Sequence, residues 1–130
     1  MNGLRRARRW PRGIAALGIA VAACAADPVT TGRPKAVVAQ LMTPYTMTEE
    51  CVHLAVGDRL DYTFTTTEPV AFNIRYHAGN AVVMPIARDQ TTGDAGVFLP
   101  KLEHDYCLMW EAGPAGALLD YRIRLRTDGR

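Results

Sequence analysis

The chain has 130 residues, of which 48% are hydrophobic and 22% are charged, and its formal net charge is +2. Five of its fifteen basic residues lie within the first twelve positions, so the chain from Cys24 onward keeps ten basic and thirteen acidic residues, a net charge of −3. This balance lacks the clustered Lys and Arg of nucleic-acid-binding proteins, and nucleic acid is not expected as a partner.

Residues 1–12 contain five Arg and no acidic residue, and residues 13–23 contain no charge. A basic head followed by a short apolar run and small residues predicts a secretory signal peptide over residues 1–23. The apolar run is too short to span a bilayer, which takes about 20 residues. We therefore expect an exported protein of the periplasm or cell envelope.

The end of this leader is consistent with two kinds of processing. Val21-Ala22-Ala23-Cys24 resembles the bacterial lipobox, in which small residues precede a Cys that is acylated and becomes the new N-terminus. Ordinary cleavage within Ala23-Cys24-Ala25 is the alternative. We expect lipidation of Cys24 and anchoring to a membrane, because each buried CH₂ of an acyl chain contributes about 0.8 kcal/mol to membrane binding.

An acylated Cys24 leaves Cys51 and Cys107 as the only possible pair of thiols. Two such thiols usually form a disulfide in the oxidising compartments that exported proteins reach. The loop closed would be about 56 residues long, and the chain-entropy model assigns the bond about 3–4 kcal/mol of stability. We predict a Cys51–Cys107 disulfide.

Residues 24–45 are predicted to be the lipidated Cys followed by a flexible linker. Pro28, Pro34 and Pro44 interrupt helix and strand alike in this stretch. Such a linker lets a folded domain stand off the membrane. Residues 35–42 within it fit either a short helix or a first strand, and the sequence does not decide between them.

A folded domain is expected over residues 46–127, where the apolar pattern has a period of two. Seven short strand-like segments are separated by turn residues: 51–56, 60–65, 70–77, 81–87, 97–102, 104–111 and 119–126. Residues 89–96 are predicted to be a polar loop, and Pro100 marks the fifth segment as an edge strand. The spacing predicts an all-β fold, an antiparallel β-sandwich of about seven strands with one wet face per sheet.

Six short motifs follow one another in this domain: Glu50-Cys51-Val52, Gly57-Asp58, Tyr62-Thr63-Phe64, Phe72–His77, Tyr106–Trp110 and Asp120–Ile123. Their order resembles the GOLD domain, a β-sandwich of secretory-pathway trafficking proteins, and small exported bacterial proteins. The resemblance covers residues 50–126. It implies a sandwich fold that binds proteins or lipids; the trafficking partners are not expected, because the leader is of a bacterial type.

The segment His104–Glu111, HDYCLMWE, places a His, a Cys, a Met and two carboxylates close together in the sequence. Alternate residues of a strand share a face, so His104 and Cys107 are expected to point to opposite sides. A blue-copper site needs two His, a Cys and a Met that converge on one point. The segment therefore predicts a strand, and no cofactor is expected.

His53 and His77 are weak candidates for ligands of Cu²⁺ or Zn²⁺, because each lies outside the apolar set of its segment. Nothing in the sequence brings them together, and a solvated or hydrogen-bonded His is the alternative for each. A carrier of a small ligand or of copper is therefore the second functional hypothesis.

Arg122, Arg124 and Arg126 alternate along the last segment, which places them on one face of a strand about 7 Å apart. Arg75 has the same outward parity and joins them if the two strands lie in the same sheet. The stripe predicts a surface for an anionic protein or lipid partner. A solvated face, with ion pairs to nearby Asp residues, is the alternative.

No convergent set of catalytic residues is apparent. The sequence contains no Ser, and a Thr or Cys nucleophile needs a matched base. Residues 93–96 lack the spacing and the Lys of a phosphate loop, and Glu49-Glu50 is interpreted as a charge pair at a strand entry. We therefore predict a non-enzymatic, lipid-anchored envelope protein with an interaction or structural role.

Overall fold

The computed structural model describes residues 27–127, and in this part of the chain every regular element is a β-strand. Six strands follow one another: β1 (Lys35–Met42), β2 (Met47–Leu54), β3 (Arg59–Ala78), β4 (Ala81–Phe98), β5 (His104–Ala112) and β6 (Ala117–Arg126). They pair antiparallel in one sheet in the order β1-β6-β3-β5-β2, and β4 pairs with the opposite edge of β3.

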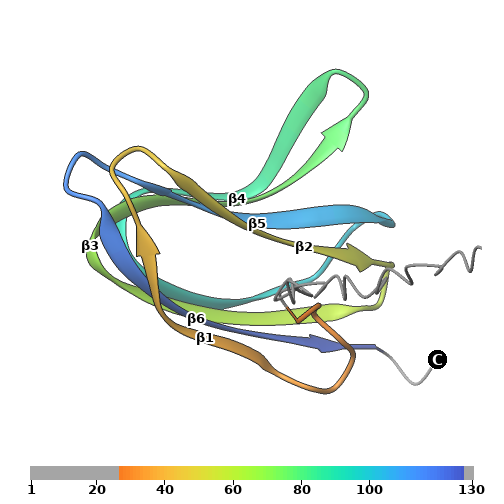
Figure 1. Ribbon diagram of the computed structural model, residues 1–130. Helices are drawn as coiled ribbons and strands as arrows, with labels where there is room; N and C mark the ends of the chain where they lie inside the picture. Colours follow the sequence, from red (N-terminus) through yellow and green to blue (C-terminus); the bar gives the residue numbers. More distant parts are fainter. Residues whose placement is uncertain (1–26, 128–130) are drawn as a thin grey trace, which may run out of the picture.

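Strand β3 shapes the fold because it has different neighbours along its length. Arg59–Thr66 pair with β6, whereas Val70–Arg75 pair with β5. Strand β4 follows β3 through this change of neighbour, with an irregular register between Thr65 and Val70. The sheet therefore curls, and the half that contains β1 and β6 faces the half that contains β5 and β2 (Figure 1).

The hydrophobic core lies between these two halves and consists of the inward residues of the period-two pattern. Four aromatic rings cross it: Phe64 and Phe72 have ring centroids 4.6 Å apart, Phe72 and Trp110 5.6 Å, and Trp110 and Tyr121 4.8 Å. Pairs at such separations contribute about 0.5–1.5 kcal/mol each beyond the area they bury. Five aliphatic residues around them have 0% exposure: Leu54, Leu60, Ile74, Leu108 and Leu119.

The number of strands differs from the expected seven because pairs of predicted segments are continuous. Residues 60–65 and 70–77 both belong to β3, and Pro69 lies where its pairing is irregular instead of ending the strand. Residues 89–96, which were expected to be a polar loop, belong to β4. Residues 93–96 are paired with residues 62–65 of β3 and Thr91 is paired with Val70, so the polar side chains of this segment do not prevent strand formation.

Pro85, the one proline of β4, fits a strand that is paired on one side only. Pro85 falls where the register with β3 is irregular, between Ile74 and Tyr76, and an edge strand tolerates the missing N–H. Of the edge strand predicted over residues 97–102, only Val97 and Phe98 lie in a strand, as the end of β4, and residues 99–102, which include Pro100, form no strand.

Part of the predicted linker belongs to the folded domain. Residues 35–42 form β1, which pairs with β6. Upstream of it, the N–H of Gly32 donates a hydrogen bond of 2.8 Å to the carbonyl of Leu125 at the end of β6. Pro34 and Pro44 therefore bound a strand, and the boundary expected at residue 46 is too late in the chain.

Candidate functional site

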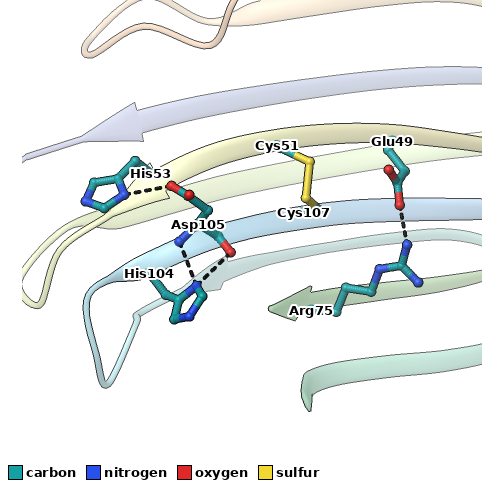
Figure 2. Close-up of a disulfide and its surroundings, with 7 residues drawn as sticks. All are labelled: Glu49, Cys51, His53, Arg75, His104, Asp105 and Cys107. Carbon is teal, nitrogen blue, oxygen red and sulfur yellow. Dashed lines mark hydrogen bonds and ion pairs between the residues drawn. A yellow bond between two sulfur atoms is a disulfide. The ribbon is translucent and has the colours of Figure 1, made fainter. Parts of the chain in front are cut away.

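A disulfide joins Cys51 of β2 to Cys107 of β5. The two residues are directly opposite each other in the register of these strands. Their neighbours Val52 and Tyr106 are buried in the core, so the cysteines point to the other face of the sheet. Cys51 is exposed and Cys107 is half-buried, and Figure 2 shows the bond joining the two neighbouring strands.

An ion pair between Glu49 of β2 and Arg75 of β3 flanks the disulfide. Strand β5 lies between β2 and β3, so the pair passes over the strand that carries Cys107 (Figure 2). Arg75 is directly opposite Cys107 in the register of β3 and β5. Its side chain is 19% exposed, and its Nε is buried and has no hydrogen-bond partner among residues 27–127.

His53 lies on the other side of the disulfide and is held by two carboxylates. Its Nδ1 is 2.7 Å from Asp105 Oδ1, and its Nε2 is 3.0 Å from Glu103 Oε1. Hydrogen bonds to Glu103 and then to Asp105 raise the pKa of His53 above its usual value of 6.5. The imidazolium form of His53 therefore links the edge strand β2 to Asp105 of β5 and to Glu103, the residue just before β5.

The structure does not bring His53 and His77 together. His77 lies near the end of β3 opposite Val82 of β4, whereas His53 is opposite Asp105 of β5. Within the described range, no group of three or more His, Cys, Asp or Glu residues is placed to hold a metal ion.

The segment HDYCLMWE forms β5 and its side chains divide between two faces. Tyr106, Leu108 and Trp110 are buried in the core, whereas Cys107 lies on the outer face beside β2. Met109 is buried as well, although it has the outward parity of Cys107. The cluster that the sequence displays is therefore separated in space.

The arginine stripe of Arg122, Arg124 and Arg126 lies exposed on the outer face of β6. Arg126 forms an ion pair with Asp61 of β3, whose other oxygen accepts a 3.1 Å hydrogen bond from Arg59. Among the described residues, Arg122 and Arg124 form no ion pair. They border a shallow hollow of about 220 Å³ with three residues of β3.

Two features explain why Arg122 and Arg124 have no acidic partner and why Arg75 lies apart from them. The carboxylate of Asp120, the acidic residue next to it in β6, accepts the N–H of Ala39 at 2.6 Å instead of pairing with an arginine. Arg75, which was expected to join the stripe if its strand lay in the same sheet, does not. It lies in the second half of β3, beside β5, where Glu49 is its partner.

A cleft of about 670 Å³ opens between β1, β2 and the segment that precedes β1. At its wall Lys35 Nζ is 2.6 Å from Glu50 Oε2, with the two side chains only 10% and 11% exposed. The hydroxyl of Tyr121 donates a 2.9 Å hydrogen bond to the same oxygen. Burial, together with the Glu50 carboxylate, raises the pKa of Tyr121 well above its usual value, so its hydroxyl keeps its proton.

Sequence reasoning missed this cleft. Glu49-Glu50 was interpreted as a pair of charges at a strand entry, but the two residues point to opposite faces and have different partners. The parity of Val52 and Leu54 gave the signal, because Glu50 shares their inward face. The sequence contained no such signal for Lys35, because residues 35–42 fitted a helix as well as a strand.

No family model matches the chain, and a search of curated proteins finds no significant match. The GOLD-like resemblance therefore remains an expectation. Cys24 and the leader lie outside the described residues. Among those that are described, no helix is long and apolar enough to cross a membrane.

Removal of the disulfide should lower stability substantially. The double variant Cys51→Ala/Cys107→Ala loses a link that closes a loop of 56 residues, which the chain-entropy model values at about 3–4 kcal/mol. Guanidinium unfolding of the mature protein measures this loss in the free energy of unfolding. An unchanged unfolding midpoint would contradict the stabilising role of the bond.

The pKa of His53 should lie above 6.5 in the folded protein and fall towards that value in Glu103→Gln and Asp105→Asn variants. Because folding raises this pKa, the contribution of His53 to stability is complete below the unfolded value near 6.5. It is lost as the pH rises through the folded pKa. Titration of the ring proton by NMR measures the pKa.

Glu111→Gln is the matched control for this titration, because it removes one negative charge from the opposite end of β5. It should leave the pKa of His53 in place. Equal shifts in all three variants would show that the effect comes from general charge and not from the two hydrogen bonds.

Proposed function

We propose that the protein is an exported, lipid-anchored protein of the bacterial cell envelope with a non-catalytic interaction or structural role. The disulfide between Cys51 and Cys107 is the observation that carries this proposal. Such bonds persist in oxidising compartments and are rare in the cytosol. The basic and apolar leader over residues 1–23 and the lipobox-like sequence before Cys24 agree with such a compartment.

We also propose that the curled sheet is a β-sandwich of the GOLD-like type. Two facing halves of a curled antiparallel sheet with an aromatic core between them support a β-sandwich of the GOLD-like type. Domains of that kind bind proteins or lipids, which agrees with a role in interaction.

The arginine stripe is the contact surface that we assign to an anionic partner. Arg122 and Arg124 are exposed and have no ion pair among the described residues, because Asp61 is taken by Arg126 and Asp120 by a backbone N–H. Guanidinium groups without partners attract anions at long range and pair with carboxylates or phosphates at contact. The rest of the mature chain is net negative, so this face differs in charge from its surroundings.

A small-ligand carrier is the second candidate, and the cleft beside Lys35 and Glu50 favours it. Its volume of about 670 Å³ lies in the range of small-molecule sites, and charged groups lie at its wall. The copper-carrier version has no comparable support, since His53 and His77 lie apart.

Mass spectrometry of the mature N-terminus tests the anchor. We expect an acylated Cys24 and recovery of the protein in the membrane fraction, with Cys24→Ser as the control that loses both. A mature protein that begins at Ala25 or Ala26 without lipid would contradict the proposed anchor.

Heparin, as a model polyanion, tests the contact surface. Replacing Arg122 and Arg124 by Gln in the mature protein should lower the salt concentration at which it elutes from a heparin column, because each lost contact reduces counterion release. The control variant Arg88→Gln/Lys101→Gln removes the same charge elsewhere on the surface. Elution of the two double variants at the same salt concentration would contradict the assignment of the arginine stripe as the contact surface.

A further inference from the structure

We propose that the Cys51–Cys107 disulfide is a thiol-exchange site, at which an external thiolate attacks the sulfur of Cys51 and Cys107 leaves. The substrate class is a low-molecular-weight thiol or an exposed cysteine of a partner protein. The proposal depends on neither the lipid anchor nor the arginine stripe. It follows from the position of the bond at the edge of the sheet, with the open side of β2 next to Cys51 and Arg75 opposite Cys107.

Access differs between the two sulfurs. Thiol–disulfide exchange is a displacement along the axis of the S–S bond, so the attacking thiolate must approach each sulfur from the side opposite its partner. The bond runs across from β2 to β5. Because β2 is an edge strand that pairs only with β5, the approach to exposed Cys51 comes from the open side of the sheet.

The approach to Cys107 is obstructed. Strand β3 continues the sheet on that side, and Arg75 is directly opposite Cys107. The ion pair of Arg75 with Glu49 covers β5 near the bond (Figure 2). Cys107 is itself half-buried. A thiolate that comes along the bond axis from this side meets protein, so attack on Cys51 is favoured.

The same neighbour makes Cys107 the better leaving group. A cation beside a cysteine lowers the pKa of its thiol, and the sulfur with the lower pKa leaves faster. Arg75 provides a permanent positive charge, and its Nε is a buried donor without a hydrogen-bond partner in the described part of the chain. A thiolate formed on Cys107 would lie on the strand directly opposite this cation in the register of β3 and β5.

The electrons balance in one displacement. The electron pair of the attacking thiolate RS⁻ forms a new bond to Sγ of Cys51. At the same time the Cys51–Cys107 bond breaks, and the electron pair of that bond stays on Sγ of Cys107, which becomes a thiolate. The products are a mixed disulfide on Cys51 and a free Cys107. A second thiolate can then attack the mixed disulfide to release RSSR and a fully reduced protein.

The fold is suited to survive this reaction. Strands β2 and β5 pair over eight positions, from Met47 and Glu111 to Leu54 and His104. On the two sides of the bond, Glu49–Arg75 and His53–Asp105 also tie β2 to the sheet. Cys51 points to the outer face, so a group attached to its sulfur lies on the opposite side of β2 from the core residues Val52 and Leu54.

Exchange with reduced glutathione tests the site in the native protein. The mature protein is incubated with glutathione, quenched with acid and digested, and the adducts are mapped by mass spectrometry. We expect glutathione on Cys51 in large excess over Cys107. Adducts mainly on Cys107, equal amounts on both, or reaction only after addition of denaturant would overturn the proposal.

The role of Arg75 has its own test, with a readout that a merely structural role would not move. Arg75→Gln should slow glutathionylation several-fold and raise the thiol pKa of Cys107 in the Cys51-glutathionylated protein, whereas Arg75→Lys should retain most of the rate. Arg88→Gln, which removes the same charge from strand β4 and lies outside both proposed sites, is the control. An unchanged pKa in Arg75→Gln would overturn the assignment of Arg75.

Discussion

Strand β3 pairs with β6 up to Thr66 and with β5 from Val70 onward, and this change of neighbour brings the two halves of the sheet to face each other across the core. The strand is continuous and its side chains alternate, so Phe64 and Phe72, eight residues apart on opposite sides of the bend, both point into the core. A shift of one residue at the bend would turn the second half over. Arg75 would then point inward and Phe72 outward.

The alternation also assigns neighbouring charges to different environments. Glu50 points inward at the open side of the curled sheet, where Lys35 and Tyr121 neutralise and hydrogen-bond it. Glu49 points outward and reaches Arg75 over β5. Removing a carboxylate from water is costly unless opposite charge and hydrogen bonds replace the lost solvation, and the largely buried Glu50 has such partners from other strands. Glu49, whose side chain is 42% exposed, keeps much of its contact with water.

The period of two was sufficient to predict an all-β fold, because it reflects burial of one face and needs no knowledge of pairing. It could not show that β3 passes from one half to the other, since Pro69 is a break signal and continuity through it depends on β4. Elimination identified the Cys51–Cys107 pair. The partners of Arg75 and Glu50 depend on which strands are adjacent, and strand order is not encoded in the alternation of any one strand.

The place of the disulfide at the edge of the sheet gives it two consequences at once. Strand β2 has a neighbour on one side only, so a covalent link to β5 opposes fraying of this edge strand. The free side that makes this link useful also leaves Cys51 open to solvent. A bond between β5 and β3, with strands on either side, would be shielded at both sulfurs and would secure strands that the sheet already holds. The position of the disulfide at the sheet edge therefore both stabilises β2 and exposes Cys51 to solvent. A thiol that opens the bond releases the covalent link of this edge strand.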